Sequence, residues 1–445
     1  MTESPAATAR QVSGSHSAFD STESFRAKAQ PAAVWPTLLA GVLSLVAQSA
    51  LRAEDWPQWR GVRGDGTWNA PALPMKWPEG GPPVVWESPI GAGYSGIAVV
   101  GQNVYTMDRP KEPADHERVV CLDLTTGKQR WQHVYPAAYG KLDYGKGPRT
   151  TPTVHAGRVY SIGAVGHVTC LDANDGRLIW KKDLVGDFKT NLATWGFSGS
   201  VVIHGDLAIV HAGAPGACYI AFDKATGDER WRGGADPLGY GTPVLVKRND
   251  HTQLIGWTPE NIVSLDADTG RENWRHPYKV TYGVSIATPI VRDDIVLVCG
   301  YWEGSKAIKL GSRPADSQLL WEENKWLRGL MSQPLYRDGH VYLLDKQHGL
   351  VCFKLQTGEM VWTDKNQLTP RDRNPQANLV WLGDTDRVIA LNAGGELILA
   401  RLSPAGYEEH SRAKIIGETW AHPAFAANFA LARDDNRIVC VRVAQ

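Results

Sequence analysis

The sequence predicts an all-β protein, an eight-bladed β-propeller whose blades have four strands each. A short segment recurs along the 445 residues and contains an apolar pair, an Asp, a Gly, and a Trp four residues after that Gly. The clearest copies are CLDLTTGKQRW (121–131), CLDANDGRLIW (170–180), AFDKATGDERW (221–231), SLDADTGRENW (264–274) and CFKLQTGEMVW (352–362). Because one such repeat cannot bury its apolar face alone, regular recurrence indicates an array of stacked units.

The spacing of the copies predicts the number of blades. Weaker copies place Trp86 and Trp321 in the same frame, and His410 stands where an eighth Trp is expected. Successive positions from 86 to 410 lie 41 to 51 residues apart, which is the length of a four-stranded propeller blade. Eight positions therefore predict eight blades.

Each copy has a structural logic of its own. The Asp carboxylate can accept hydrogen bonds from the amides of a turn, and the Gly can take the positive φ that closes a hairpin. The returning strand then places its Trp on the same face each time, where burial of the indole would hold neighbouring blades together. The predicted docking residues are Trp86, Trp131, Trp180, Trp231, Trp274, Trp321 and Trp362.

The two ends of the repeat region predict how the ring closes. Trp86 belongs to an outer strand with no strands before it, and RIVCVRV (437–443) is a strand with no Trp strand after it. Joining them completes one blade from both termini and removes the open sheet edges. Several blades begin with a Pro, as at Pro152 and Pro243, directly before the strand that should line the axial channel. Residues just before this strand should face the mouth of the channel.

The chain is expected to have three parts. Residues 1–53 are interpreted as an export leader, because an uncharged apolar run follows a Ser/Ala-rich start, with cleavage near Ser49 or Ala53. The alternative is a leader that is retained as a membrane anchor. Residues 54–82 form an N-terminal strap, and residues 83–445 form the propeller.

Composition and motifs exclude several kinds of function. Lys plus Arg and Asp plus Glu number 47 each, so no overall positive field would attract nucleic acid. The six cysteines are expected to be small core residues without disulfides, and the first, Cys121, lies too far along the chain to carry a lipid after the leader. No C-x-x-C, H-E-x-x-H or G-x-S-x-G motif occurs. The adhesion tripeptide Arg63-Gly64-Asp65 is more typical of a turn in this Gly-rich strap.

The repeat resembles the tryptophan-docking motif of the pyrroloquinoline-quinone-like (PQQ-like) propeller family. This family includes quinoprotein alcohol dehydrogenases and the eight-bladed propeller lipoprotein of the bacterial outer-membrane assembly complex. The resemblance covers residues 83–445, strongly in five blades and weakly in three. The opening EDWPQWRGVRGDGTW (54–68) is similar to the start of secreted bacterial propellers that carry the same repeats without an assigned activity.

Differences between this sequence and the quinoprotein dehydrogenases of the family favour one of two possible functions. The resemblance implies that a dehydrogenase would have adjacent cysteines over the quinone and a calcium ion beside an Asp base, and neither feature maps onto this sequence. We therefore expect an exported, non-catalytic scaffold or binding propeller, periplasmic or secreted, monomeric and without a cofactor. Its ligand would be a protein, peptide or saccharide, with membrane contact only through an uncleaved leader. The alternative is a divergent quinoprotein dehydrogenase with PQQ and calcium.

Candidate ligand-binding residues are aromatic or cationic groups beside Gly at the expected channel mouth. Such groups can stack on flat ligands or grip a peptide strand. The competing interpretation is that they only fill the channel. These residues are Arg149, Trp195, Tyr240, Trp257, Tyr282, Trp302 and Trp420. No catalytic residue or metal ligand is predicted.

Overall fold

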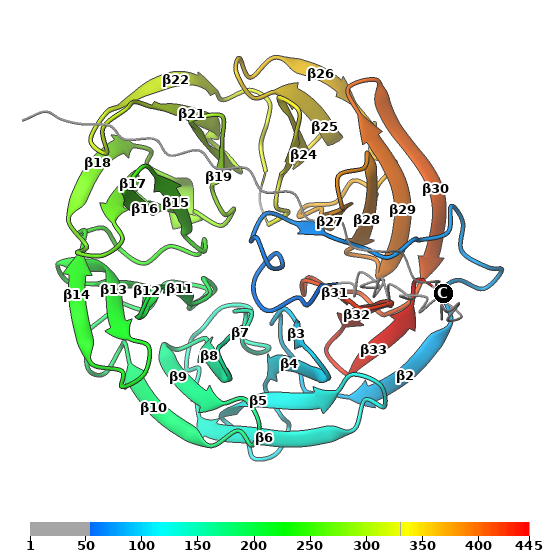
Figure 1. Cartoon of the computed structure of the whole chain (residues 1–445), viewed down its shortest axis with the longest axis horizontal. Helices are drawn as coiled ribbons and strands as arrows, with labels where there is room; N and C mark the ends of the chain where they lie inside the picture. The colour runs from blue at the N-terminus through cyan, green and yellow to red at the C-terminus, as the bar shows by residue number, and fades with distance from the viewer. Residues whose placement is uncertain (1–53, 330, 445) are drawn as a thin grey trace, which may run out of the picture. The chain divides into compact units, whose positions relative to one another are not determined.

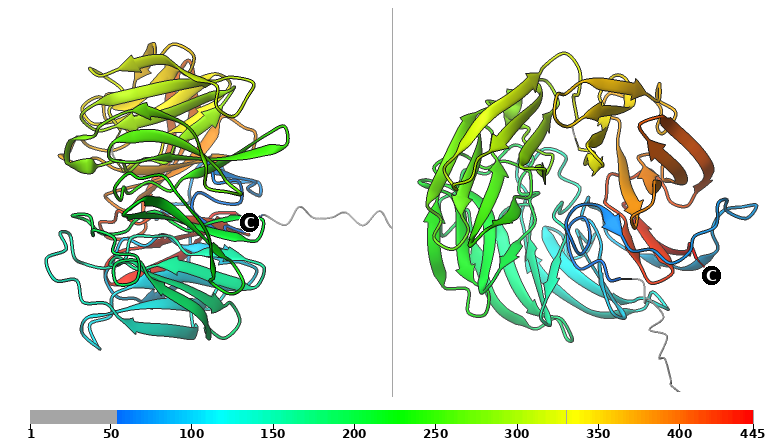
Figure 2. Two further views of the ribbon diagram at one scale, coloured as in Figure 1. Left: turned by 90° about the vertical axis from the view of Figure 1, so that its left-hand side faces the viewer. Right: turned by 45° about the horizontal axis from the view of Figure 1, so that its top comes forward.

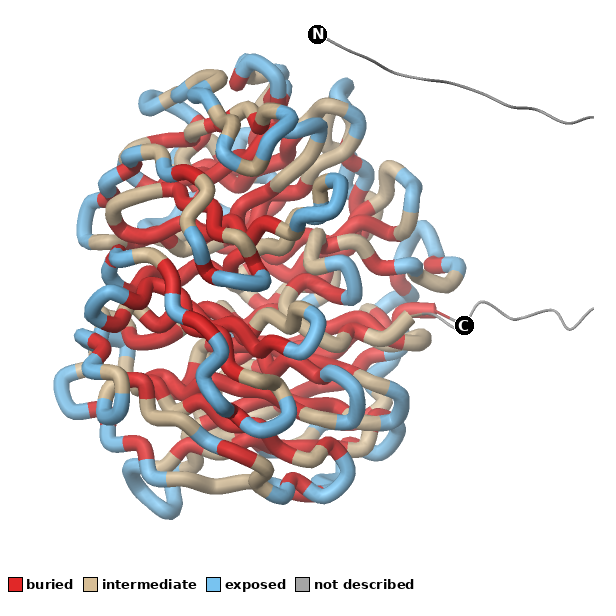
Figure 3. Tube along the Cα trace, turned by 60° about the vertical axis from the view of Figure 1, so that its left-hand side comes forward, coloured by how far each residue is buried: buried red, intermediate tan, exposed pale blue. Residues whose placement is uncertain are grey.

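The computed structural model describes residues 54–329 and 331–444, which form a ring of eight sheets (Figure 1). The strands cross the thickness of the ring, so that the hairpin turns lie at its two faces (Figure 2). The strand centres are buried and the turns are exposed (Figure 3). Within the described residues the one helical segment is the 3₁₀ turn η1 (Thr281–Gly283), and none forms a helix long and apolar enough to cross a membrane. The predicted eight-bladed, all-β propeller is confirmed.

Each of the first four blades is an antiparallel meander of consecutive strands, with its first strand at the channel. The first blade contains β3 (Ala98–Val100), β4 (Asn103–Asp108), β5 (His116–Asp123) and β6 (Gln129–Pro136). The second contains β7 (Thr153–His155), β8 (Arg158–Ile162), β9 (His167–Asp172) and β10 (Leu178–Asp183). The third contains β11 (Val202–His204), β12 (Leu207–Ala214), β13 (Ala217–Asp223) and β14 (Glu229–Gly233). The fourth contains β15 (Val244–Arg248), β16 (His251–Trp257), β17 (Asn261–Asp266) and β18 (Glu272–Pro277).

The next three blades repeat this order, and the seventh gains an extra strand at the channel. The fifth contains β19 (Ile290–Arg292), β20 (Ile295–Gly300), β21 (Gly304–Leu310) and β22 (Ser317–Glu323). The sixth contains β23 (Leu335–Arg337), β24 (His340–Asp345), β25 (Gly349–Lys354) and β26 (Met360–Thr363). The seventh contains β27 (Ala377–Leu382), β28 (Arg387–Asn392), β29 (Glu396–Ser403) and β30 (Gly406–Lys414), with β1 (Thr67–Trp68) parallel to β27. Several inner strands begin directly after a Pro, as at Pro152 and Pro243.

The eighth blade joins the two ends of the repeat region, as the sequence predicted. It contains β31 (Ala424–Ala426), β32 (Phe429–Arg433), β33 (Arg437–Arg442) and β2 (Val84–Pro89). The outer strand β2 pairs antiparallel with β33, and Trp86 lies opposite Cys440. The closing blade therefore has the same register as the others, although its outer strand comes from the other end of the repeat region.

The outer hairpins have the predicted turn chemistry. In the first blade, the Asp123 carboxylate accepts hydrogen bonds from the amides of Thr125 and Thr126, at 3.0 and 2.9 Å. Gly127 follows with φ +68°, and a β-carbon on it would lie 2.4 Å from the indole ring of Trp86 in the preceding blade. Gly is therefore required twice, for the left-handed turn and for the close approach of the neighbouring ring.

The docking tryptophans link each blade to the next one. An indole N–H donates a hydrogen bond to a backbone carbonyl beside the outer hairpin of the following blade. Six such bonds are formed: Trp86 to Leu124 (2.7 Å), Trp131 to Ala173 (3.1 Å), Trp180 to Lys224 (3.1 Å), Trp231 to Ala267 (3.2 Å), Trp321 to Leu355 (2.9 Å) and Trp362 to Ser403 (3.0 Å). The repeated contact explains why Trp recurs once per blade.

Two blades depart from this pattern. The Trp274 indole N–H has no hydrogen-bond partner among the described residues, and the next outer hairpin, 311–316, is one residue longer than 124–128. In the seventh blade the expectation for His410 was wrong. Every outer strand has a bulge one residue before its Trp, and here the bulge falls on His410, so that Ser411 takes the Trp position.

The strap covers the seam that lacks a docking Trp. The Trp77 amide donates a hydrogen bond to the hydroxyl of Ser411, at 3.0 Å. The side chains of Trp56, Trp68 and Trp77 are buried in one cluster with apolar residues of the seventh and eighth blades. Figure 1 shows the strap, in dark blue, running from the centre of the ring outward over the seventh blade. Trp68 and Trp77 thus pack at the interface that the repeat leaves open.

The beginning of the strap crosses the channel. Trp56 forms an antiparallel bridge with Val99 of β3, and the carbonyl of Pro57 accepts a hydrogen bond from the amide of Val154 in β7. On the far side of the ring, the Trp59 indole donates to the Thr288 hydroxyl at 2.9 Å, just before β19. The strap therefore closes the channel.

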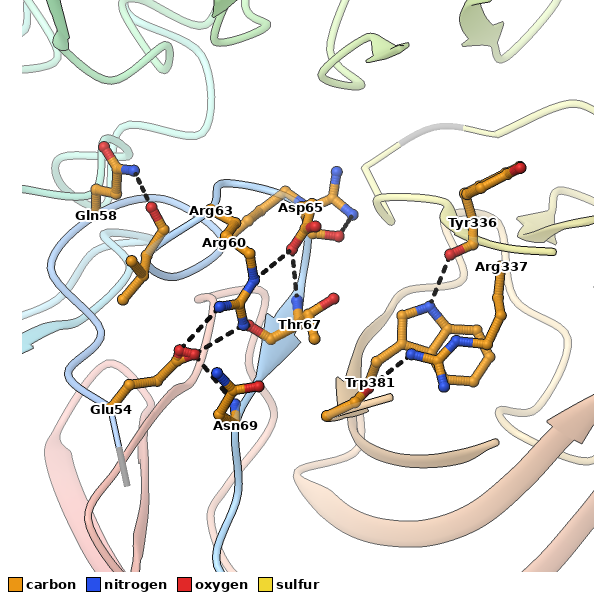
Figure 4. A network of polar contacts seen from close by, with 12 residues as sticks. Glu54, Gln58, Arg60, Arg63, Asp65, Thr67, Asn69, Tyr336, Arg337 and Trp381 are labelled. Carbon is orange, nitrogen blue, oxygen red and sulfur yellow. Dashed lines mark hydrogen bonds and ion pairs between the residues drawn. The ribbon is translucent and has the colours of Figure 1, made fainter. Parts of the chain in front are cut away.

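A polar network holds the strap in the channel (Figure 4). Arg60 is only 3 % exposed, and its guanidinium donates to the carbonyls of Asp65 and Pro334. Arg63 pairs with Glu54 at 2.7 Å, and Asp65 pairs with Arg292 at 2.8 Å. Both charged groups of the Arg-Gly-Asp sequence are engaged within the fold, which agrees with its interpretation as a turn.

Burial lowers the pKa of two bases beside this network. The pKa of Arg60 falls to about 10, mainly because burial removes water from the guanidinium. The ring of His422 lies 4.2 Å from the ring of Trp59, and neither of its nitrogens has a hydrogen-bond partner among the described residues. Burial, assisted by the charge of Arg60, lowers the pKa of His422 to about 3. His422 is therefore neutral at pH 7.

Substitution of Trp231 should cost more stability than substitution of Trp274. Trp231→Phe removes the bond to Ala267 and leaves a buried carbonyl unpaired, whereas Trp274→Phe removes an N–H that has no partner. Both tryptophans are almost fully buried, at 8 % and 6 % exposure, so the packing losses are matched. We expect Trp231→Phe to be less stable by about 1 kcal/mol, measured by urea unfolding. Equal losses would contradict a stabilising role for the indole bond.

His422 should make the fold sensitive to acid. Its pKa is lower in the folded state than in the unfolded chain, so the unfolded state binds the proton first and stability falls as pH drops from 6.5 toward 3. This one group should remove about 2 kcal/mol between pH 7 and pH 5. In urea unfolding the total loss should be about 2 kcal/mol smaller in His422→Gln than in the wild type or the exposed-site control His155→Gln, because the buried His211, whose pKa is also lowered, contributes equally in all three. A pH dependence unchanged in His422→Gln would contradict the prediction.

Candidate functional site

A cavity of about 260 Å³ lies at the mouth of the channel, above the strap. Its wall includes Thr242, Gln333 and His422, which each stand two residues before the first residue of an inner strand, β15, β23 and β31 respectively. Its full lining is Trp59, Tyr94, Tyr144, Arg149, Trp195, Ser198, Tyr240, Thr242, Val284, Ile286, Tyr301, Trp302, Met331, Gln333, Arg373, Asn374, Gln376, Trp420 and His422. We call this cavity the mouth cup.

Trp59 of the strap forms part of the inner end of the mouth cup. Its ring packs on His422, and its indole N–H is held by Thr288. The next residue, Arg60, lines a second cavity beside β15, β19 and the strap. The strap therefore divides the channel and turns one end of it into a closed cup.

The walls of the mouth cup are largely aromatic, and the rings touch across loops from different blades. Trp420 lies 5.8 Å from Tyr94, in a stacked arrangement, and 5.7 Å from Tyr144. In another part of the wall, the ring centres of Trp195 and Tyr240 are 5.4 Å apart. Such contacts fix the rings before any ligand arrives, which lowers the entropy cost of binding.

Tyr301 and Trp302 complete the aromatic wall from a turn of the fifth blade. Their rings are 4.4 Å apart and nearly perpendicular. The ammonium group of Lys346 lies 3.9 Å from the centre of the Tyr301 ring and 5.6 Å from that of Trp302. These cation–π contacts place a positive charge at the rim.

Arg149 brings a second positive charge into the mouth cup. Its guanidinium donates to the carbonyls of Asp143, Tyr144 and Gly147 and lies 5.7 Å from the ring of Tyr94. Burial lowers its pKa, while the side chain remains a cation at neutral pH. Burial likewise raises the pKa of the Tyr94 and Tyr240 hydroxyls, so both stay neutral.

The structure brings five of the seven candidate residues together. Arg149, Trp195, Tyr240, Trp302 and Trp420 line the mouth cup, and their binding of a ligand remains a prediction.

Two candidates lie elsewhere, which corrects their expected placement. Trp257 ends β16 with its ring stacked on Tyr278 at 5.5 Å, and it is only 1 % exposed because it belongs to the core between two blades. Tyr282 is 77 % exposed on η1 and projects beside Trp302 outside the cup.

Four aromatic residues of the cup were not among the candidates. Tyr94 in GAGYSG has the same Gly-flanked setting as Tyr240 in LGYGTP, so a local signal existed for it. Tyr301 is the direct neighbour of a candidate. Tyr144 and Trp59 carry no such signal, because their places depend on a long loop and on the path of the strap.

The residues of the mouth cup do not fit a quinone held with calcium. No Asp or Glu belongs to its lining, and the described residues contain no group of three His, Cys, Asp or Glu side chains able to hold a metal. All six cysteines are free and buried, and no two are adjacent in the sequence. The side chain of Trp59 also forms part of the inner end of the cup.

Two kinds of known protein resemble this sequence. It is 22% identical over 325 residues to the outer membrane protein assembly factor BamB of Yersinia pestis, with 68% of this chain and 75% of that protein covered. It is 29% identical over 152 residues to the quinohemoprotein alcohol dehydrogenase ADH-IIG of Pseudomonas putida, with 30% of this chain and 20% of the enzyme covered. The match to the enzyme thus omits most of its length.

Solved structures of both kinds share the fold. BamB from Moraxella catarrhalis superposes with a TM-score of 0.56 at 17% identity, covering 80% of this chain and 98% of that one. The quinohemoprotein alcohol dehydrogenase from Comamonas testosteroni gives a TM-score of 0.62 at 15% identity, covering 87% and 80%. At such identities the likeness shows the fold alone.

The family model described as outer membrane protein assembly factor BamB matches residues 115–364, which is over half of the chain. The match covers the repeats from the first to the sixth blade. This chain therefore belongs to the BamB family of PQQ-like β-propellers.

Proposed function

We propose that this protein is an exported, non-catalytic propeller that holds a segment of a partner protein at its channel mouth. The main support is the position of its exposed aromatic side chains. Tyr144, Tyr282, Trp302 and Trp326 are the exposed aromatic residues of the described chain, at 37–77 % exposure. All four lie in connections at the mouth face, between one blade and the next or between two middle strands.

This surface has the composition of a protein interface. Trp, Tyr and Arg are enriched where proteins bind one another, and a few such residues provide most of the binding energy. Here exposed rings surround a cup that contains Arg149. Exposed apolar residues away from the mouth, such as Leu319 and Val361, are aliphatic and stand on outer strands.

The relatives support the same kind of function. Several of them are named as outer membrane protein assembly factors, and a scaffold without catalytic groups agrees with a cup that has no carboxylate. We infer that this chain acts as a monomeric scaffold in the assembly of outer-membrane proteins. The predicted leader, which lies outside the described residues, would direct it to the periplasm.

Loss of an exposed ring at the mouth should weaken binding of an unfolded client. The test uses an outer-membrane β-barrel polypeptide diluted from urea, with binding measured by suppression of its light scattering. Trp302→Ala should need about tenfold more protein for the same effect. Leu319→Ala, a similarly exposed residue on the outer strand β22, should behave like the wild type.

Crosslinking from a photoreactive residue shows where on the propeller the client binds in the same assay. Placed at position 282 on the mouth, this residue should crosslink to the client, and placed at position 319 it should not. Equal crosslinking at both positions, or equal loss of binding in both alanine variants, would contradict binding at the mouth.

The quinone alternative makes the opposite prediction for cofactor binding. Since the mouth cup has no carboxylate to hold calcium, PQQ with calcium should neither raise the melting temperature nor enable reduction of an artificial electron acceptor by an alcohol. Alcohol-dependent reduction of the acceptor would instead establish a dehydrogenase and overturn the non-catalytic proposal.

A further inference from the structure

We propose that the segment held at the mouth is acidic and carries one large apolar or aromatic side chain. The cup receives that side chain, and cations at its rim pair with the flanking carboxylates. This inference rests on the proposed function and specifies the chemistry of the client. Its basis is the arrangement of Arg149, Lys346, Arg371 and Arg373 around the aromatic rings.

The size and lining of the cup suit a single anchor. Its volume of about 260 Å³ lies just below the range of pockets that take drug-sized ligands, so it accepts one bulky side chain with some backbone. Trp59, Trp195, Tyr240 and Trp420 line it, and aromatic groups pack favourably in offset or edge-to-face contacts. A flexible aliphatic or aromatic anchor fits this interior.

The rim provides an excess of positive charge. A shallow depression formed partly by Tyr301, Trp302 and Arg373 adjoins the cup, since these residues line both. It adds Lys346 and Arg371, with Asp372 as its one acidic residue. Carboxylates of a bound peptide would therefore meet cations on leaving the cup through this depression.

These cations are available for a ligand. No ion pair within the described residues involves Arg149, Lys346, Arg371 or Arg373. Arg149 makes three bonds to carbonyls through two of its nitrogens, which leaves some of its five donors free. Guanidinium groups bind carboxylates through two parallel hydrogen bonds, so such arginines favour an acidic partner.

In the second cavity, beside the strap, arginines form ion pairs with carboxylates of the protein itself. There Arg63 pairs with Glu54, and Arg292 pairs with Asp65. Those cations serve the strap. The cations at the mouth have no comparable carboxylate partners, and this contrast locates the acidic ligand at the mouth.

Fluorescence polarisation with labelled peptides tests the inference on the full chain. The probe is a short peptide of alternating Asp and Ser with one central Trp. Matched peptides replace every Asp by Asn, every Asp by Lys, or the Trp by Ser. We expect the acidic Trp peptide to bind at least tenfold more tightly than each of the others, and its affinity to fall as salt is added.

Variants at the rim identify the groups involved. Arg373→Met and Lys346→Met should each weaken the acidic peptide by about tenfold and leave the Asn peptide unchanged. Both side chains stand at the rim and make no hydrogen bond or ion pair within the described residues, so the fold should be retained. The control is Arg313→Met, whose side chain is 81 % exposed and pairs with Asp316 in an outer hairpin.

Each contrary outcome has a distinct meaning. Equal binding of the Asp and Asn peptides would overturn the acidic specificity, while mouth binding would stand. Failure of every peptide, with the barrel polypeptide still crosslinked at position 282, would overturn this inference and leave the proposed function intact. A third outcome is that no peptide binds, that oligogalacturonate binds, and that Arg373→Met abolishes its binding. This outcome would assign the site to acidic saccharides and overturn the inference. Failure of both assays would remove the proposed function as well.

Discussion

In five blades the docking indole packs on the Gly turn of the next blade and donates its N–H to a carbonyl there; these residues are Trp86, Trp131, Trp180, Trp231 and Trp321. This contact gives each blade a fixed place beside its neighbour, because a bulky ring and a directional bond act at the same point. The Gly at the turn cannot be exchanged, since any β-carbon would meet the ring, as Gly127 and Trp86 show. Everything at the channel mouth depends on this fixed ring, because the loops that form the site come from many blades.

The interface between the seventh and eighth blades lacks this contact. The closing blade takes its outer strand from the beginning of the repeat region, so no hairpin joins β33 to β2, and the seventh blade has Ser411 in place of Trp. Tryptophans of the strap pack there in place of a docking Trp. The strap also continues through the channel, where Trp59 faces the mouth cup. The segment that seals the ring thus shapes the site.

The structural likeness to quinoprotein dehydrogenases and the lining of the mouth cup suggest different chemistry. Likeness to quinoprotein dehydrogenases rests on the scaffold, since blades are held together in the same way whatever the channel contains. The mouth cup has aromatic walls and cations but no carboxylate. Such a lining suits recognition of an anionic group and offers no carboxylate to a calcium ion. A propeller without catalytic groups can still be selective, because rigid rings and unpaired arginines recognise shape and charge together.

The sequence by itself determined the blade count, the closure through Trp86 and β33, and the roles of Asp, Gly and Trp in each hairpin. These features are local and repeated, so one physical explanation applies to all copies. It also led to five residues of the cup: Arg149, Trp195, Tyr240 and Trp420 precede inner strands, and Trp302 lies in the connection between β20 and β21. It misplaced His410, since the Trp position of this blade, Ser411, lies 12 residues after its cross-strand partner Leu399, whereas Trp131 lies 10 residues after Cys121. It also misplaced Trp257 and Tyr282, whose strand and turn direct their rings into the core and into solvent.

Only the tertiary structure showed that the strap crosses the channel and that Trp59 and Tyr144 join the cup. Those positions result from contacts between residues far apart in the chain, such as Trp59 with Thr288, and no local pattern encodes such contacts.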